Sequence, residues 1–388
     1  MKKQKRLLRE SSAASRGVET MGFLMNRRRL LQASSAALTV GALISKTGRS
    51  VAKSSDQVRI TVGGGDYGRA NIEAYVKPFQ EETGIKVIPI TDDVNTAQLE
   101  LMVTTNNITV DVVELGQGTA NTLASKGYLQ DIDYSIYNNT ELNGIIEFAK
   151  QPFGVAALIY SYVMVYNTEK FPANKPRPTS WAEFWDVKKF PATRVLMSGQ
   201  GGSSGPWEEA LLADGVAADQ LYPMNIDRIF ASLDRIKPHI RKWWGSGSEI
   251  QQIMHDKVVD IGNSYDGRAS LLIDKGGAIE INRNQAKLAW NYWAIPKGSP
   301  NAPSAQRFVE FATRAERQAA FARLVSYGPS NRNAYNLLPE NVGRKLASHP
   351  DYIASSIPMN TQWYAEKGAD GRSNTERLMQ RWNAWILQ

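Results

Sequence analysis

The sequence contains the stretch Val58-Arg59-Ile60-Thr61-Val62-Gly63-Gly64-Gly65-Asp66-Tyr67-Gly68, in which an extended apolar run ends in a glycine-rich turn. A run compatible with a helix, residues 69–82, follows directly. β-Branched apolar residues predict a buried strand, and glycine accepts the backbone angles of a tight turn. The stretch therefore predicts a strand-turn-helix unit, which is typical of α/β folds.

The glycine turn allows two functional interpretations. The spacing Gly63-x-Gly65-x-x-Gly68 matches the dinucleotide fingerprint, in which glycines let the backbone approach a pyrophosphate at a helix N-terminus. On that hypothesis the chain is an exported NAD(P)-dependent oxidoreductase, with Asp92 or Asp93 binding the ribose. Against it, Asp66 would place a negative charge beside the pyrophosphate, and the sequence has no lysine–histidine constellation for hydride chemistry. The other interpretation is a loop that presents Asp66 and Tyr67 as one lip of a cleft for a small cation.

The region up to residue 133 alternates between strand-like and helix-like segments. Gly84 is a helix stop, because glycine accepts a left-handed C-terminal cap, and Asn95 or Thr96 can cap the next helix. This alternation predicts a parallel sheet with helices on its faces. The predicted strands and helices, in order, are 58–62, 71–82, 85–90, 97–104, 109–115 and 119–126.

The middle of the chain changes character. Residues 155–166 form a long run rich in β-branched and aromatic residues, which favours a strand over a buried helix. Ser180 with Glu183, and Ser246 with Glu249, match the capping-box pattern of a helix start. The remaining predictions are core packing for Trp181, Phe184 and Trp185, a flexible loop at 199–205, a helix at 226–236, strands at 258–261 and 290–296, and one helix at 305–324.

The charge of the chain is unevenly distributed. The net charge is +8, but residues 1–52 hold eleven Lys and Arg against two Asp and Glu. The remaining 336 residues hold 35 basic and 36 acidic side chains and are nearly neutral. The basic balance therefore belongs to the N-terminal segment, and we expect no nucleic-acid partner.

The N-terminal segment resembles a twin-arginine export signal. Asn26-Arg27-Arg28-Arg29-Leu30-Leu31 precedes the apolar residues 33–44 and the small residues Ser50-Val51-Ala52. The apolar part is too short to span a bilayer comfortably, and it lacks the polar face of an amphipathic surface helix. We therefore expect residues 1–52 to be a signal peptide and the mature protein to be periplasmic, with translation starting at Met1, Met21 or Met25.

Other residue types limit the chemistry. The chain has no cysteine, which excludes disulfides and thiolate sites, and no further run approaches the ~20 apolar residues of a membrane span. His239, His255 and His349 lack metal-ligand spacing, so we expect no metal and no cofactor. A hydrolase is not favoured, because there is no G-x-S-x-G motif and Ser203 and Ser204 have no evident base nearby.

Six segments in order resemble the extracellular solute-binding proteins of ABC importers, in the spermidine/putrescine-type branch. The resemblance covers residues 57–335. The segments are Phe79-Gln80-Glu81-Glu82-Thr83-Gly84-Ile85-Lys86-Val87, Val110-Asp111-Val112-Val113, Gly127-Tyr128-Leu129-Gln130-Asp131-Ile132-Asp133, Thr179-Ser180-Trp181-Ala182-Glu183-Phe184, Trp293-Ala294-Ile295-Pro296-Lys297 and Tyr327-Gly328-Pro329-Ser330-Asn331.

This resemblance implies a two-lobed type II periplasmic-binding-protein fold of the α/β class. Crossover strands near residues 160–166 and 292–296 would join the lobes, which close on a ligand by a hinge motion. Lobe 1 would combine residues 57–158 and 292–335, lobe 2 would be 159–291, and 336–388 would pack on the lobes as a helical segment. The protein would be a monomeric non-enzyme that delivers its ligand to the membrane subunits of a permease.

The resemblance also implies a ligand site on loops at the strand ends. Carboxylates would bind an ammonium group, and aromatic rings would add cation–π contacts. Relatives carry an aromatic residue two positions before the acid of the first loop, where this chain has Gly64. The predicted ligand contacts are Asp66, Tyr67, Glu208, Trp243, Trp244, Tyr265, Asp266, Trp290 and Asn291.

Two ligand classes remain open at this point. A polyamine such as putrescine or spermidine needs an acid at each end, and Asn291 stands where relatives carry one of these acids. Arg241 and Arg268 would instead bind the carboxylate of an ω-amino acid such as 4-aminobutyrate through a bidentate pair. The sequence predicts a small aliphatic amine, a term that includes both classes.

Overall fold

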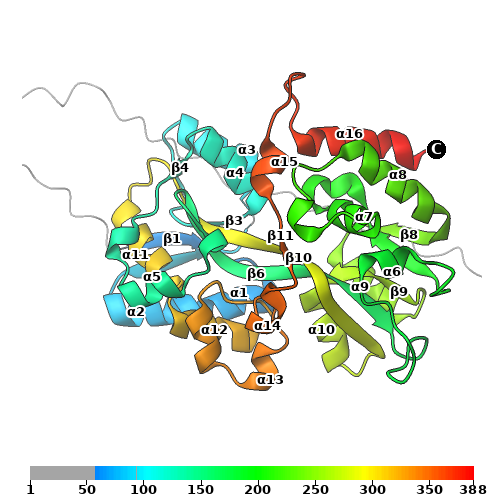
Figure 1. Ribbon diagram of the computed structural model, residues 1–388. Coiled ribbons are helices and arrows are strands. Elements are labelled where there is room, and N and C mark those ends of the chain that lie inside the picture. The colour runs from blue at the N-terminus through cyan, green and yellow to red at the C-terminus, as the bar shows by residue number, and fades with distance from the viewer. Residues whose placement is uncertain (1–56, 93) are drawn as a thin grey trace, which may run out of the picture. The chain divides into compact units, whose positions relative to one another are not determined.

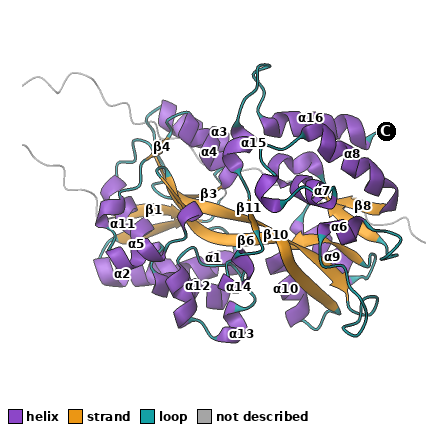
Figure 2. Ribbon diagram, in the orientation of Figure 1, coloured by secondary structure: helices purple, strands orange, loops and turns teal. Residues whose placement is uncertain are grey.

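The computed structural model describes residues 57–92 and 94–388 (Figure 1). The predicted signal peptide, residues 1–52, and Asp93 lie outside the described residues. Within the part described, no helix is long and apolar enough to cross a membrane. Helices lie on both faces of the central strands (Figure 2), which confirms the predicted α/β class.

The first strands form the predicted parallel arrangement. β1 (Gln57–Thr61) pairs in parallel with β2 (Lys86–Ile90), and Ile60 bridges in parallel to Val112, just before β3 (Val113–Gly116). The helix after β1 begins at Gly65, six residues earlier than predicted, and Gly84 ends it with φ 70° as predicted. This helix consists of α1 (Gly65–Asn71), the π-helical turn Ile72–Val76 and α2 (Lys77–Thr83).

The rest of this region follows the prediction closely. Asn95 caps α3 (Thr96–Thr104) through a capping box, accepting a hydrogen bond from the backbone of Gln98. Short helices, turns and strands connect α3 to the long strand that follows. These elements are α4 (Gln117–Ser125), β4 (Leu129–Gln130), the 3₁₀ turns Tyr134–Ile136 and Glu147–Ala149, α5 (Asn139–Gly144) and β5 (Lys150–Gln151).

Two long strands pair with each other and run through the sheet. β6 (Gly154–Asn167) confirms the predicted strand at 155–166, and it lies antiparallel to β10 (Ile279–Pro296). β10 begins at Ile279, far before the predicted residue 290. Their ladder is interrupted between Asn282 and Lys287. The sheet order is β11-β10-β6-β9-β7-β8, with β3 and β4 paired to β10 and β5 to β6.

The second half of the chain supplies the other strands and their helices. Ser180 and Ser246 accept hydrogen bonds from the backbone of Glu183 and Glu249, so both predicted helix starts are confirmed. The elements are α6 (Trp181–Trp185), β7 (Arg194–Met197), the 3₁₀ segment Gly199–Ser204, α7 (Trp207–Ala213), the 3₁₀ turn Ala218–Gln220, α8 (Ile226–Ile236), the 3₁₀ turn Lys237–His239, β8 (Ile240–Trp244), α9 (Gly247–His255), β9 (Ile261–Tyr265) and α10 (Asp266–Asp274).

Three local predictions were wrong. The strand predicted at 258–261 is β9, which starts only at Ile261, because it pairs with β6 through Tyr265. The loop at 199–205 is a 3₁₀ segment, and Gly199 packs so tightly that an added Cβ would lie 2.4 Å from Trp207. The helix at 305–324 is two helices, since Arg314 is extended and the backbone N–H of Ala315 donates instead to Glu141.

The C-terminal part carries short elements and one longer helix. α11 (Ala302–Ala312) and α12 (Ala315–Leu324) precede the 3₁₀ turn Arg332–Leu337. They are followed by α13 (Glu340–Gly343), α14 (Pro350–Ile353), β11 (Ile357–Pro358), α15 (Thr361–Ala365) and α16 (Asn374–Ile386).

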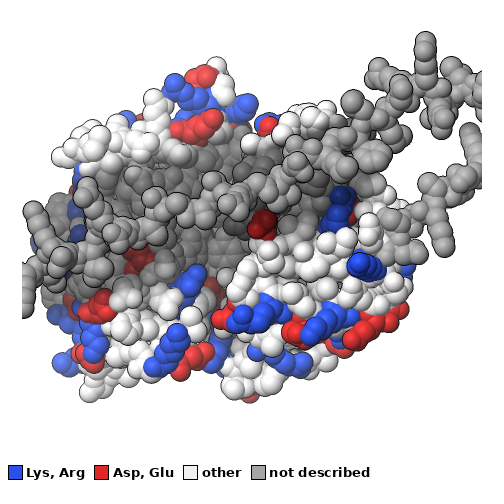
Figure 3. Space-filling view, turned by 180° about the vertical axis from the view of Figure 1, so that it is seen from behind, with Lys and Arg blue, Asp and Glu red and all other residues white. Residues whose placement is uncertain are grey.

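The buried apolar side chains fall into separate cores, which is the physical basis of two lobes. One core combines residues 58–159 with residues 288–321 and Ala347. Two others are built from residues 162–289, and residues 357–385 join one of these. β6 and β10 contribute to both sides. On the part of the face in Figure 3 that belongs to the described residues, basic and acidic side chains are interspersed.

Candidate functional site

A polar cavity of about 430 Å³ lies at the carboxyl end of β1 and beside the first two residues of β3. The carboxyl ends of parallel strands are the usual place for ligands in α/β sheets. Two lining residues are acidic and none is basic. The lining residues are Thr61, Gly63, Gly64, Tyr67, Asp92, Val94, Val113, Glu114 and Asn291.

Glu114 is the partly buried acid of this cavity. One carboxylate oxygen accepts a hydrogen bond from the Tyr67 hydroxyl, and the other accepts one from Asn291 Nδ2 at 2.7 Å. Burial raises the pKa of the Glu114 carboxyl, and these two hydrogen bonds oppose the rise. The chain thus holds an oriented carboxylate at the cavity wall, with oxygen lone pairs left for a further donor.

Sequence reasoning missed Glu114. It sits in the predicted strand 109–115 between Val113 and Leu115, both of which are buried. The available signal was a second acid, after Asp111, near the end of a largely apolar strand. Side chains alternate between the two faces of a strand, so Glu114 points away from the core that its neighbours fill.

Tyr67 is fixed by aromatic neighbours as well as by Glu114. Its ring meets Phe321 and Tyr327 edge to face, with centroids 5.7 and 5.8 Å apart. Burial raises the pKa of Tyr67 well above its usual range, and the nearby Glu114 charge raises it further. The phenol therefore stays protonated and donates to the carboxylate.

Further tyrosines lie beyond Tyr67: Tyr160, Tyr265 and Tyr327 are partly exposed, and Tyr162 is buried. Tyr160 lies 6.0 Å from Tyr265 between ring centroids, and Tyr162 lies 4.9 Å from Tyr265. Burial raises the pKa of Tyr327, which the Arg268 charge lowers and the Glu114 charge raises. Arg268 lies on the first turn of α10, where its Nε and the Tyr265 ring both flank Gly247 and its Nη1 is 3.5 Å from Gln251 Oε1.

The two predicted aspartates do not line the cavity. Asp66 is exposed on the first turn of α1 and pairs with Arg69. Asp266 is only 1% exposed, where it accepts a hydrogen bond from the backbone of Ser161 at 3.0 Å and pairs with Arg283 at 3.3 Å. Both carboxylates are thus engaged within the protein.

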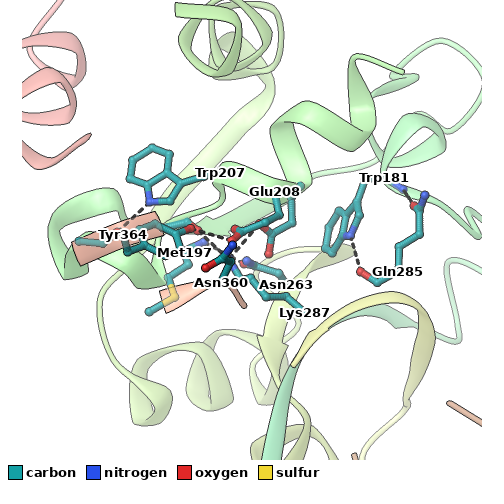
Figure 4. Close-up of polar contacts among 12 residues, drawn as sticks. Trp181, Met197, Trp207, Glu208, Asn263, Gln285, Lys287, Asn360 and Tyr364 are labelled. Carbon is teal, nitrogen blue, oxygen red and sulfur yellow. Dashed lines mark hydrogen bonds and ion pairs between the residues drawn. The ribbon is translucent and has the colours of Figure 1, made fainter. Parts of the chain in front are cut away.

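Glu208 lies in a buried ionic cluster (Figure 4). Lys287 Nζ is 2.9 Å from Glu208 and 3.1 Å from Glu209, and all three side chains are 1% exposed. The hydroxyls of Tyr222 and Tyr364 also donate to Glu208. Burial would lower the pKa of Lys287, but the two glutamates outweigh it and raise that pKa. The cluster joins α7, β10 and α15.

The remaining predicted residues divide between core and surface. Trp244 is fully buried and donates to Asn263 at 3.0 Å, while Trp243 packs on Trp382 and Trp385. Trp290 is buried against Phe148. Tyr265 and Asn291 are partly exposed, and Arg241 and Arg268 are exposed. Of the predicted set, the structure brings together Tyr67 and Asn291 at the cavity, and places Tyr265 and Arg268 side by side at Gly247, outside the cavity lining.

Comparison with known proteins decides the family. Residues 74–350 match the family described as "Bacterial extracellular solute-binding protein". The chain belongs to this family. Its solved relatives have the two-lobed fold predicted from the sequence, so that prediction is confirmed. Members of this family are solute-binding proteins, so the chain is a solute-binding protein and not a catalyst by family.

Several individual proteins of known name or structure are similar to this chain. A gamma-aminobutyric acid-binding protein of Pseudomonas aeruginosa is 30% identical over 342 residues, covering 86% of this chain and 92% of the relative. The spermidine/putrescine-binding periplasmic protein of Escherichia coli is 24% identical, covering 77% and 86%. An ABC transporter substrate-binding protein from Bradyrhizobium japonicum has a TM-score of 0.74 and 30% identity, covering 85% and 99%. These relatives are solute-binding proteins and not enzymes, which argues against the dinucleotide hypothesis for Gly63 to Gly68.

Proposed function

We propose that this solute-binding protein captures a small aliphatic amino compound and delivers it to the permease of an ABC importer. The observation that carries the proposal is the Glu114 carboxylate, held by Tyr67 and Asn291 at a cavity with no basic lining residue. An ammonium group is the complementary partner, because charge-assisted hydrogen bonds are about twice as strong as neutral ones.

Within that class, an ω-amino acid such as 4-aminobutyrate fits better than a diamine. Arg268 lies beside Tyr265 at Gly247, outside the lining of the Glu114 cavity, and a guanidinium there attracts a carboxylate and repels a second ammonium. The tyrosine faces pack against the methylenes between the charged ends. The γ-aminobutyrate-binding relative supports this order, and the spermidine/putrescine-binding relative keeps polyamines as the second candidate.

The lobes supply the means of capture. Residues 57–158 and 292–335 would form lobe 1, residues 159–291 lobe 2, and 336–388 would pack on both, an assignment that the separate cores support. A ligand that touches Glu114 in one lobe and Arg268 in the other stabilises the closed form by its differential affinity.

The route to the periplasm rests on the leader. Arg27 and Arg28, with the apolar residues 33–44, match a twin-arginine signal, and the relatives are periplasmic or extracellular. Replacing Arg27 and Arg28 together with lysine should leave the protein in the cytoplasm, as judged by cell fractionation. Periplasmic delivery of that variant would reject the twin-arginine route and leave solute binding unaffected.

Calorimetric titration of the mature monomer with 4-aminobutyrate, putrescine and spermidine tests the ligand class. We expect saturable binding of 4-aminobutyrate, with weaker binding of the two polyamines. Heat from the polyamines alone would reverse the order of the candidates. If none of the three compounds gives measurable binding heat, the ligand class is rejected and the family membership is unaffected.

A further inference from the structure

The long strand β10 has a bulge in the middle of its pairing with β6. β10 leaves its ladder with β6 between Asn282 and Lys287, and Gln285 has φ 57°. Gln285 accepts hydrogen bonds from both Trp181 nitrogens, at 2.9 Å to its side chain and 3.1 Å to its carbonyl (Figure 4). Its own N–H donates to the Ser355 carbonyl at 3.0 Å. The bulge is therefore fixed by hydrogen bonds to Trp181 on one side and to Ser355 on the other.

Arg283 extends from this bulge and is 11% exposed. One guanidinium nitrogen, Nη1, is 3.3 Å from Asp266 Oδ2. The other, Nη2, donates to the carbonyl of Lys345, and the guanidinium carbon lies 4.8 Å from the centroid of the Tyr352 ring. A planar guanidinium can make such contacts in several directions at once, which an ammonium cannot.

Asp266, the carboxylate partner of Arg283, lies where β9 passes into α10. Asp266 starts α10, directly between Tyr265 and the Gly267-Arg268 pair. Its other carboxylate oxygen accepts from the backbone of Ser161 on β6 at 3.0 Å. The placement of Tyr265 and Arg268 therefore depends on how Asp266 is held.

The Lys345 end belongs to the other lobe. Ala347 is part of the core built from residues 58–159 and 288–321. Ser348 Oγ donates to the Pro329 carbonyl at 2.8 Å and also contacts the Tyr335 hydroxyl at 2.8 Å. Residues 345–352, which we call the docked segment, are thus carried by the first lobe, while Asp266 lies in the second.

We propose that Arg283 is a positioning residue that couples the relative position of the lobes to residues 265–268, where β9 passes directly into α10. When the lobes rotate about the crossover strands, the docked segment moves relative to α10, and Arg283 transmits that movement to Asp266. The inference rests on the proposed function only in assigning Tyr265 and Arg268 to the ligand. The mechanical link itself is independent of which solute is bound.

The experiment compares three variants by two readouts. Arg283→Met removes the link, and Arg283→Lys keeps a positive charge but not the planar contacts. Asp274→Asn is the matched control, since Asp274 pairs with Lys345 at 2.6 Å and joins the same two elements without touching Asp266. Because the chain has no cysteine, Glu81→Cys with Asp227→Cys places one spin label on each lobe without background labelling.

The first readout is the distance distribution between the labels in ligand-free protein, and the second is the dissociation rate of bound 4-aminobutyrate. Arg283→Met should change the ligand-free distribution and raise the dissociation rate about tenfold, the scale of one lost charge-assisted hydrogen bond. Arg283→Lys should fall between wild type and Arg283→Met, and Asp274→Asn should match wild type in both readouts.

Two results would overturn the coupling. One is an Arg283→Met protein that is folded by circular dichroism yet matches wild type in both readouts. The other is an Asp274→Asn protein that reproduces the Arg283→Met changes. In that case the loss of any contact between the lobes would produce the changes, and Arg283 would have no particular role. If Arg283→Met does not fold, Arg283→Lys takes its place in both comparisons. If no ligand binds wild type, the proposed function fails, and the label distances still decide the coupling.

Discussion

Asn291 Nδ2 donates to Glu114 at 2.7 Å and so joins a strand of the first lobe to the crossover strand β10. The two residues are diagonal neighbours on the antiparallel β3–β10 pair, where Asn291 is paired with Gly116 and Glu114 with Trp293. The amide thus orients the carboxylate without neutralising it. An acid at position 291 would instead repel Glu114.

Replacing Glu114 with glutamine should weaken binding of 4-aminobutyrate by about ten- to a hundredfold, since a hydrogen bond to a charged group is worth about 1.5–3 kcal/mol. Titration calorimetry measures the change. Asp66→Asn is the matched control, because that exposed carboxylate pairs with Arg69 outside the cavity. Equal losses in both variants would argue against Glu114 as the ammonium partner.

Arg268→Met should separate the two ligand classes. Affinity for 4-aminobutyrate should fall about tenfold or more with the loss of a bidentate partner for its carboxylate. Affinity for putrescine should stay or improve, because a repulsive charge is removed. Competition titration with both ligands gives the comparison, with the exposed Arg241→Met as control. A parallel loss for both ligands would show that Arg268 does not select the carboxylate.

Ligand binding should weaken as the pH falls toward 5. Burial raises the pKa of Glu114, so this carboxyl takes up its proton at a higher pH than an ordinary glutamate, whose pKa is about 4.3. The protonated acid no longer attracts the ligand ammonium, and affinity is lost as the pH falls through the raised pKa. Titrations between pH 7.5 and 5 test this in wild type and Glu114→Gln. A pH dependence that persists in the variant would assign it to another group.

Lys287→Met should destabilise the fold by about 3–5 kcal/mol, because two buried glutamates lose their cation. Adding Glu209→Gln should restore part of this loss, since one uncompensated charge is then removed. Urea unfolding measures both. The matched control is Lys189→Met, whose exposed pair with Glu183 is worth about 1 kcal/mol at most. A loss for Lys287→Met no larger than the control would mean that the cluster is already neutral.

Acid should weaken the first lobe through Asp111. Burial would raise the pKa of Asp111, but hydrogen bonds from Arg59, Asn301 and Ser299 outweigh it and lower that pKa. Its contribution is therefore present above the unfolded-state pKa of about 3.9 and is lost as the pH falls through the lower folded-state pKa. Asp111→Asn should cost about 2–4 kcal/mol at pH 7 and flatten the acid dependence of unfolding below pH 4. An equally steep acid loss in the variant would exclude Asp111 as its source.

Helices, strands and caps could be predicted where neighbouring residues in the sequence determine them. The strand around Ile60, the cap at Asn95 and the stop at Gly84 follow from apolar pattern, side-chain capping and left-handed glycine geometry. The break at Arg314 could not be predicted, because the Ala315 N–H finds its partner in Glu141, far away in sequence. The same holds for the full length of β10, which is set by its partner β6.

The sequence by itself determined the α/β class, the basic N-terminal segment with a nearly neutral remainder, and the segments that resemble solute-binding proteins, because these depend on composition and short-range pattern. Only the tertiary structure decided which acids face the cavity. Asp66 and Asp266 follow strands as expected, but both lie in the first turn of a helix, where one pairs with Arg69 and the other with Arg283, while Glu114 stands at the cavity wall. Whether a carboxylate is free for a ligand depends on partners brought from distant segments, and residue spacing does not contain that information.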